Sequence, residues 1–419
     1  MKKIFYLLLV VLASFNLQAA KMLIPMDESG QTNHLKAYGI AFLVLTKNEK
    51  IDWLLNYKGG SFVFDYFQEI ENECKIRNVS YEILPDAKYT SILTEIADPE
   101  VNMDIVRLEK APKIAVYTPD GKLPWDDAVT MVLTYAEIPF DKVYDDELLD
   151  DKLIKYDWLH LHHEDFSGQY GKFYAAYNSA DWYINDVKKN EAMAKKHGFE
   201  KVSQLKLATA KKIKEFVIGG GYLFAMCSAT DSYDIALAAE GTDICERMYD
   251  GDAADPAAQS KLNFDRCLAF KDFTLKTNPM EYEYSDIDAT TTRKVPFKSD
   301  YFTLFAFSAK FDPIPTMLCQ NHTTTVKGFM GQTTSFTNKF LKSSTQVLGE
   351  NKSAGEARYI HGDLGKGTWT FYGGHDPEDY QHAVGDPPTD LSLHPNSPGF
   401  RLILNNVLFP AAKKKPQKT

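Results

Sequence analysis

A cysteine at the end of an apolar strand is the residue in this sequence best placed to do chemistry. It is Cys227, in the segment VIGGGYLFAMCSATDSYD, where a predicted strand runs directly into a predicted helix. A tight strand-to-helix turn at a nucleophile requires small residues two positions before and after it, and Ala225 and Ala229 meet that demand. At a helix N-terminus the dipole favours the thiolate, and the N–H of Ser228 would face a developing oxyanion. The spacing therefore predicts a nucleophilic thiol.

A histidine late in the chain is the predicted partner of this thiol. His375 follows Gly373-Gly374 at the end of another predicted strand, and Asp376 and Glu378 come shortly after it. Because the carboxyl ends of strands in an open parallel sheet line one crevice, we expect Cys227 and His375 to meet there. His375 would take and return the proton, and Asp376 or Glu378 would orient its ring.

This pattern of three glycines, a strand, a cysteine elbow and a late histidine resembles the class I glutamine amidotransferase-like superfamily over residues 113–240 and 356–410. In that family a Cys nucleophile works with the His and Glu of a His-Pro-Glu motif. The matches here are Cys227, His375 and Glu378, with one extra residue between the histidine and the proline. The resemblance implies a flavodoxin-like open parallel sheet and a hydrolase or amidotransferase-like activity that attacks an amide or ester.

The same resemblance places a second oxyanion donor in the loop FSGQYGKF, where the matching residue is Gly168. Over nearly its whole length the chain also resembles exported bacterial proteins labelled asparagine synthetase B. True asparagine synthetases resemble an N-terminal-cysteine glutaminase joined to an ATP-pyrophosphatase with a Ser-Gly-Gly-x-Asp-Ser loop. The mature chain should start near Lys21, and it contains no such loop, so we do not expect that activity.

Histidines and acids also follow the predicted strand at 156–163. His160 and His162 share one face of this strand, and His163 takes the other. Imidazole and carboxylate groups at such spacing suit zinc, yet no HExxH or CxxC pattern supports a metal. We therefore predict no metal and no cofactor, and we interpret His162 and His163 as side chains that contact a ligand in a polar crevice.

Three functions remain open on these residues. The first is a thiol hydrolase that uses Cys227 and His375. The second is a non-catalytic module on the same fold that binds a carbohydrate or another polar small molecule, which the extra residue after His375 favours. The third is a metal-dependent hydrolase built on His160, His162 and His375.

Two runs of alternating strands and helices must position these side chains. Residues 21–110 read as a smaller N-terminal α/β domain with a parallel sheet and a helix over 34–46. The alternation restarts at 113 and predicts one amidotransferase-like domain over 111–410, with an insertion at about 240–355. Within it, Gly365 and Gly367 mark a hairpin turn, and Ser397 caps a final helix. Residues 411–419 read as a basic tail.

The first twenty residues have the layout of a secretory signal peptide: Lys2-Lys3, a short apolar run, then Leu17-Gln18-Ala19-Ala20. The run is too short to span a bilayer and no cysteine follows it, so we expect an exported, periplasmic or secreted protein without a membrane anchor. An oxidising compartment favours disulfides, and Cys245 and Cys267 are the predicted pair. The alternative is five buried free thiols.

Composition restricts the class of partner. With 44% hydrophobic and 25% charged residues over 419 positions, the chain has the composition of a folded protein. Its 57 acids against 47 bases give a net charge of −10, which repels a phosphate backbone and disfavours nucleic acid as a partner. We therefore expect a small-molecule substrate or ligand; the oligomeric state is left open.

Overall fold

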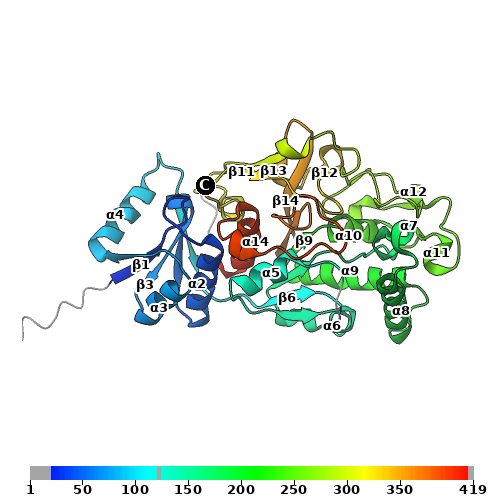
Figure 1. The fold of residues 1–419 in the computed structure, drawn as a ribbon, viewed down its shortest axis with the longest axis horizontal. Coiled ribbons are helices and arrows are strands. Elements are labelled where there is room, and N and C mark those ends of the chain that lie inside the picture. Colours follow the sequence, from blue (N-terminus) through cyan, green and yellow to red (C-terminus); the bar gives the residue numbers. More distant parts are fainter. Residues whose placement is uncertain (1–19, 120–123, 414–419) are drawn as a thin grey trace, which may run out of the picture.

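The computed structural model of this chain describes residues 20–119 and 124–413. The predicted signal peptide, residues 1–20, lies outside the described residues except for Ala20, and so does most of the predicted basic tail. The described residues form a mixed α/β structure with a small antiparallel sheet and a large mixed sheet (Figure 1). Within them, no helix is both long and apolar enough to cross a membrane.

The small sheet is antiparallel throughout, so the expected parallel N-terminal sheet is wrong. Its order is β4-β1-β3-β2-β5. The strands are β1 (Ala20–Ile24), β2 (Ile51–Leu55), β3 (Ser61–Asp65), β4 (Glu82–Pro85) and β5 (Asp104–Leu108). The physical reason is the connection after β2, where Asn56, Lys58, Gly59 and Gly60 all have positive φ and reverse the chain directly into β3. The glycine pair therefore makes a hairpin rather than leading to a helix.

Three helices complete this part of the chain: α2 (His34–Thr46), α3 (Gln68–Ile76) and α4 (Asp86–Ala97). The predicted helix over 34–46 has the observed bounds, and Asn33 caps it by accepting from the backbone N–H of Lys36. Helix α4 and strand β5 close this part of the chain, and β5 lies at one edge of the small sheet.

The large sheet has the order β11-β10-β13-β14-β15-β9-β8-β6-β7, with β12 paired to β14. Its parallel half comprises β6 (Ile114–Tyr117), β7 (Asp141–Val143), β8 (Trp158–Leu161), β9 (Tyr222–Met226) and β15 (Gly367–Tyr372). Its antiparallel half comprises β10 (Tyr301–Leu304), β11 (Thr325–Lys327), β12 (Phe336–Thr337), β13 (Gln346–Asn351) and β14 (Glu356–Leu364). The open parallel sheet that we expected is therefore one half of a mixed sheet, and the predicted insertion extends that sheet.

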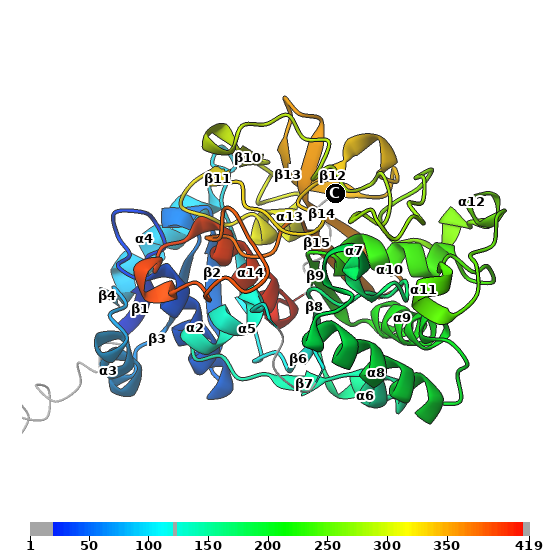
Figure 2. The ribbon, with the colours of Figure 1, turned by 45° about the vertical axis from the view of Figure 1, so that its right-hand side comes forward.

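Helices cover both faces of the parallel half (Figure 2). In β9, Phe224 and Met226 belong to one core with α5 (Ala128–Tyr135) and α14 (Pro398–Leu408), while Leu223 and Ala225 belong to the other with α9 (Val202–Gly219) and α10 (Ala229–Ala238). This alternation is what a strand buried on both faces requires. The remaining helices are α6 (Asp145–Leu149), α7 (Tyr174–Tyr177), α8 (Asp181–Lys196), α11 (Arg247–Asp250), α12 (Ala258–Lys261) and α13 (Pro313–Leu318).

Helix α14 joins the two sheets. It packs against α2 and α5, and its fully buried Arg401 donates to the carbonyls of Met26, at 2.8 Å, and Gly59. A buried guanidinium satisfied by backbone carbonyls fixes its neighbours because leaving its donors unpaired would be costly. The N-terminal sheet therefore shares a core with the larger one.

All five cysteines are free, so the predicted pairing of Cys245 with Cys267 is wrong. The Cys245 thiol donates to the carbonyl of Ser167 at 3.4 Å, and the Cys267 thiol donates to the carbonyl of Asp234 at 3.3 Å. The two side chains lie in different hydrogen-bonding environments, each buried.

Candidate functional site

The turn after β9 has the backbone of a strand-to-helix elbow. Cys227 sits between β9 and α10 with φ of 50°, in the left-handed region that non-glycine residues rarely occupy. Its N–H donates to the carbonyl of Gly374 at 3.1 Å, and its carbonyl accepts from the hydroxyl of Thr230 at 2.7 Å. These bonds hold the residue in a strained conformation, which is a feature that occurs often at functional positions.

The thiol itself is enclosed. Cys227 is only 3% exposed, and burial raises the pKa of its thiol to about 12, although the backbone N–H groups of Ser228 and Gln332 favour the thiolate. The carboxylates of Asp231 and Asp288 both add to the rise in the Cys227 pKa. At neutral pH this thiol is therefore protonated and weakly nucleophilic. The oxyanion-donor role expected of Ser228 stays a prediction.

His375 is hydrogen-bonded through both ring nitrogens. Its Nδ1 lies 3.0 Å from Nε2 of His162, and its Nε2 lies 3.2 Å from Oδ1 of Asp126. The ring also stacks on His382 with centroids 3.9 Å apart. Among the described residues His375 has no hydrogen bond to Cys227, so the proposed proton transfer between them stays a prediction that this arrangement does not favour.

The two carboxylates expected to orient His375 lie elsewhere, and Asp126 takes their place. Glu378 accepts from the hydroxyl of Tyr380 at 2.7 Å and lies 3.2 Å from Nδ1 of His394. Asp376 accepts from the N–H of Glu378 at 2.9 Å, and burial raises its pKa to about 6. Neither carboxylate hydrogen-bonds to the imidazole of His375 within the described part of the chain.

A row of histidines, comprising His160, His162 and His375, crosses the carboxyl ends of β8 and β15. Nε2 of His160 lies 3.2 Å from Nδ1 of His162, which in turn reaches His375. Both His160 and His162 are fully buried, and burial lowers the pKa of His162 and of His375 below the ordinary value. The imidazoles of His162 and His375 are therefore neutral at physiological pH.

Asp127 joins this row from the start of α5. Its Oδ1 lies 3.5 Å from Nε2 of His160 and 3.6 Å from Nδ1 of His162. The same oxygen caps α5 by accepting from the N–H groups of Val129 and Thr130 at 2.8 and 2.9 Å. Although burial acts to raise it, the neighbouring imidazoles of His162 and His160 hold the pKa of Asp127 below its usual range.

Sequence reasoning missed Asp126 and Asp127 as site residues. A signal existed, because two adjacent acids follow Trp125 in the connection from β6 to α5, and such connections at the carboxyl ends of parallel strands line the crevice.

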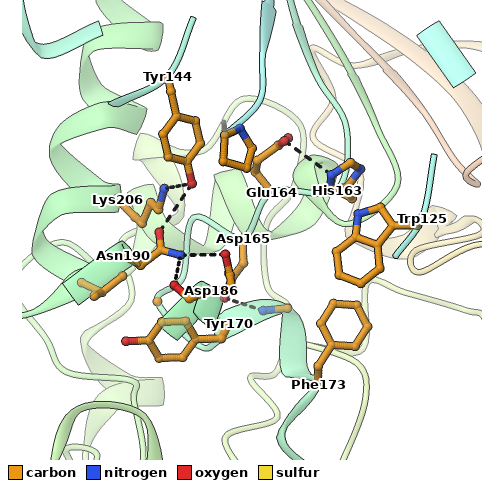
Figure 3. A pocket seen from close by; sticks show the side chains of 14 residues that line it. Trp125, Tyr144, His163, Glu164, Asp165, Tyr170, Phe173, Asp186, Asn190 and Lys206 are labelled. Atoms are coloured by element: carbon orange, nitrogen blue, oxygen red, sulfur yellow. Dashed lines mark hydrogen bonds and ion pairs between the residues drawn. The ribbon is translucent and has the colours of Figure 1, made fainter. Parts of the chain in front are cut away.

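A small cavity of about 50 Å³ lies beside the histidine row, next to His163 (Figure 3). The rings of Trp125 and Phe173 stack along one side of it, with centroids 5.1 Å apart. His163 and Glu164 border it, and Oε1 of Glu164 lies 3.7 Å from Nε2 of His163. We call these four side chains and the space between them the Trp125 pocket.

Several buried polar atoms of the Trp125 pocket have no hydrogen-bond partner among the described residues. They are Nε1 of Trp125, both ring nitrogens of His163 and Oε1 of Glu164. Burial lowers the pKa of His163 to about 3 and raises that of Glu164 to about 8. Both side chains are therefore mainly uncharged at pH 7, and a cluster of unpaired buried polar groups calls for water or a ligand.

The loop at 165–171 supports this pocket through Asp165. Its carboxylate accepts from the N–H groups of Ser167, Gln169 and Gly171 at 2.6 to 3.1 Å. Gly168 has φ of 85°, and a Cβ there would lie 2.8 Å from Cα of Ser203. Gly168 thus allows the loop to approach α9 closely, and its expected role as an oxyanion donor stays a prediction.

More aromatic side chains surround the pocket. Trp182 contacts both Trp125 and Phe173 edge-on, and Phe173 also contacts Tyr282, which is 39% exposed. Tyr282 also lies near Cys227: burial and then this thiol are the leading causes of the rise in its pKa. Aromatic side chains therefore extend from the Trp125 pocket toward the surface at Tyr282.

Comparison with known proteins adds little to this geometry. No family model matches the chain, and no curated protein matches it. Among solved structures, it is similar to the Cytoplasmic Protein STM3548 from Salmonella typhimurium, with 11% identity, TM-score 0.33, and coverage of 72% of this chain and 100% of that one. It is also similar to Cytoplasmic Protein STM1381 from Salmonella typhimurium LT2, with 12% identity, TM-score 0.34, and coverage of 72% of this chain and 100% of that one. A third similar structure is a catalytic mutant of Gan42B, a GH42 beta-galactosidase from G. stearothermophilus. The identity is 11% and the TM-score 0.26, and the match covers 63% of this chain and 27% of that chain.

Proposed function

We propose that this chain is an exported module that binds an uncharged polar small molecule, such as a carbohydrate, in the Trp125 pocket. One observation carries the proposal: unpaired buried polar atoms converge there beside stacked aromatic rings. Ligand pockets typically combine apolar or aromatic walls with a few polar groups that fix orientation. Export rests on the predicted signal peptide.

The cation that borders the pocket does not favour an anionic ligand. Lys206, which borders the pocket, is buried and paired with Asp145 at 2.8 Å, and it also donates to the hydroxyls of Tyr117 and Tyr144 at 3.0 Å each. A cation already matched by a carboxylate has little left to offer an anionic ligand. The aromatic faces and the unpaired donors and acceptors suit a ligand with both apolar C–H faces and hydroxyl groups.

The size of the cavity limits what it encloses. About 50 Å³ is the space of one or two water molecules, so we expect it to take one substituent of the ligand. The rest would lie against the half-exposed aromatic side chains outside, including Tyr282 and Trp182.

A binding experiment tests this proposal. Titration of the mature chain with maltose, cellobiose and lactose, followed by calorimetry and by tryptophan fluorescence, should find at least one that binds. Trp125→Ala should weaken that binding at least tenfold, because it removes an aromatic wall. Phe311→Ala, which truncates an aromatic ring that is 67% exposed, serves as the matched control and should bind as the parent does. Absence of binding for all three sugars, or equal binding by Trp125→Ala, would end the carbohydrate proposal.

A thiol hydrolase is the second candidate, favoured by the left-handed φ of Cys227 at the elbow. It requires that the thiol become ionised and that a base reach it during turnover. A screen of amide and ester substrates, comparing the parent with Cys227→Ala, tests this candidate. Turnover that disappears in Cys227→Ala would establish it over simple binding.

A further inference from the structure

We propose that Asp127, His160 and His162 form a binding site for a divalent transition-metal ion such as Zn²⁺. This inference does not depend on the ligand proposed for the Trp125 pocket. Oδ1 of Asp127, Nε2 of His160 and Nδ1 of His162 face one another across distances of 3.2, 3.5 and 3.6 Å. Two imidazoles and a carboxylate are a ligand set that zinc accepts.

The triangle has the dimensions of a zinc site. A point equidistant from corners that are 3.2, 3.5 and 3.6 Å apart lies about 2.0 Å from each, and Zn–N and Zn–O bonds are about 2.0 to 2.2 Å long. The edge of a regular tetrahedron with bonds of about 2.05 Å is about 3.3 Å, close to these three sides. An ion slightly out of the plane would therefore have three protein ligands and one further position.

The second ring nitrogen of each of the two histidines has a partner of the kind that metal-binding histidines use. The other ring nitrogen of His160, Nδ1, lies 3.1 Å from the carbonyl of Phe224. The other nitrogen of His162, Nε2, lies 3.0 Å from His375, which continues to Asp126. Such contacts to a carbonyl or onward to a carboxylate fix the tautomer and point the remaining lone pair at the ion.

Counting protons gives an independent argument. The row makes four contacts: Phe224 to His160, His160 to His162, His162 to His375, and His375 to Asp126. Each contact needs one proton between its two atoms, yet three neutral imidazoles carry only three. A cation between His160 and His162 removes the shortage, since both nitrogens then present lone pairs to it.

The carboxylate of Asp127 is fixed in place beside the two imidazoles. Its Oδ1 is held by the two N–H groups that it caps, and its Oδ2 is buried without a partner among the described residues. The side chain of Asp127 is 11% exposed, while His160 and His162 are fully covered.

A second cluster of potential metal ligands is not proposed as a site, and it provides a control for the experiment. Asp243, Cys245 and Asp250 also lie close together, but Nζ of Lys201 lies 2.5 Å from Asp243 and 3.0 Å from Asp250. A resident lysine cation already neutralises those carboxylates, so we expect no ion there.

Titration with Co²⁺ and Zn²⁺ tests the inference. The mature chain, purified without an affinity tag and treated with a chelator, should bind one Co²⁺ per chain with the visible absorption of tetrahedral cobalt and no thiolate charge-transfer band. Zn²⁺ should displace it. Asp127→Asn should weaken Co²⁺ binding by at least about tenfold while keeping the helix cap, since Asn is as good an N-cap as Asp. Circular dichroism checks the fold.

Two further variants locate the ion. His162→Gln should lower the stoichiometry to near zero, whereas Cys245→Ser should bind as the parent does. The inference is overturned if the parent binds no metal, which would mean that one extra proton fills the row. It is also overturned if Co²⁺ binding survives unchanged in both Asp127→Asn and His162→Gln, and loss of binding in Cys245→Ser would then place the ion at the other cluster.

Discussion

The ends of β8 and β9 lie side by side in the parallel half of the large sheet, yet they present opposite chemistry. At the end of β9 the chain makes a strained turn that displays a single thiol, and burial beside Asp231 and Asp288 keeps that thiol neutral. At the end of β8 the backbone does not enter the left-handed region, and His160 and His162 meet one carboxylate, that of Asp127, from another segment. The difference teaches that a turn of the right shape does not activate a nucleophile. Burial decides its ionisation first, and the acids beside it add to the effect.

The largest expected effect concerns the reactivity of the thiol. With a pKa of about 12 in place of about 8.5 for a free cysteine, Cys227 should react with iodoacetamide at pH 7 at least about a hundredfold more slowly than the same residue in urea. Mass spectrometry across pH 5 to 9 reads the modification of Cys227. If Cys227 in the native protein is labelled at the rate of a free thiol, the thiol is activated, and the hydrolase candidate is favoured over simple binding.

The next effect separates His375 from Cys227. His375→Ala should lower the free energy of unfolding by about 3 kcal/mol, because it leaves His162 and Asp126 without their partner in a buried place. It should leave the labelling rate of Cys227 unchanged within twofold. Urea unfolding and labelling measure the two quantities.

The matched control for that variant is His382→Ala. His382 stacks on His375 but hydrogen-bonds to the nearby Asp379, so its removal should cost less than 1 kcal/mol. A large drop in Cys227 labelling on loss of His375 would show that the two residues act as a pair.

A smaller effect should appear in the pH dependence of stability around the elbow. Burial raises the pKa of Asp288 to about 6, above the value of about 3.9 in the unfolded chain. Its contribution to stability is therefore complete below pH 3.9 and is lost as pH rises through 6. Between pH 4 and 7 the parent should lose about 2 kcal/mol more than Asp288→Asn does. Urea unfolding at the two pH values measures these losses of unfolding free energy. Equal losses in the parent and in Asp288→Asn would mean that the pKa of Asp288 is not raised.

The smallest expected effect concerns backbone strain at the elbow. Cys227→Gly and Cys227→Ala both remove the thiol, but only glycine adopts a φ of 50° without a steric penalty. We expect Cys227→Gly to be more stable than Cys227→Ala by about 1 kcal/mol. Thermal unfolding of the two variants measures the difference, and an alanine variant of equal or greater stability would argue against strain.

Local sequence patterns predicted several elements well. The bounds of α2 agree with the helix predicted over 34–46, and Ser397 caps α14 by accepting from the N–H of Phe400. The hairpin of β14 and β15 turns at Gly365, which has φ of 63°. These features depend on residues a few positions apart, where spacing, capping and turn preference act directly.

Pairing over long distances was predicted poorly. The N-terminal strands alternate with helices along the chain, which favours a parallel sheet, yet the turn at residues 56–60 makes that sheet antiparallel. The predicted insertion continues the large sheet through β10, β11 and β13 because their edges pair with β14 and with one another. The sequence of a short strand in a polar segment does not indicate which other strand it pairs with.

Local sequence was enough to place the cysteine turn, flanked by Ala225 and Ala229, and His375, which follows two glycines. The histidines at the end of β8 were placed by the apolar strand that contains or precedes them. Only the tertiary structure decided their partners. His375 meets His162 and Asp126, which lie 213 and 249 positions away in the chain. Contacts over such separations depend on strand order and helix packing, and the burial that sets the pKa of Cys227 depends on them as well.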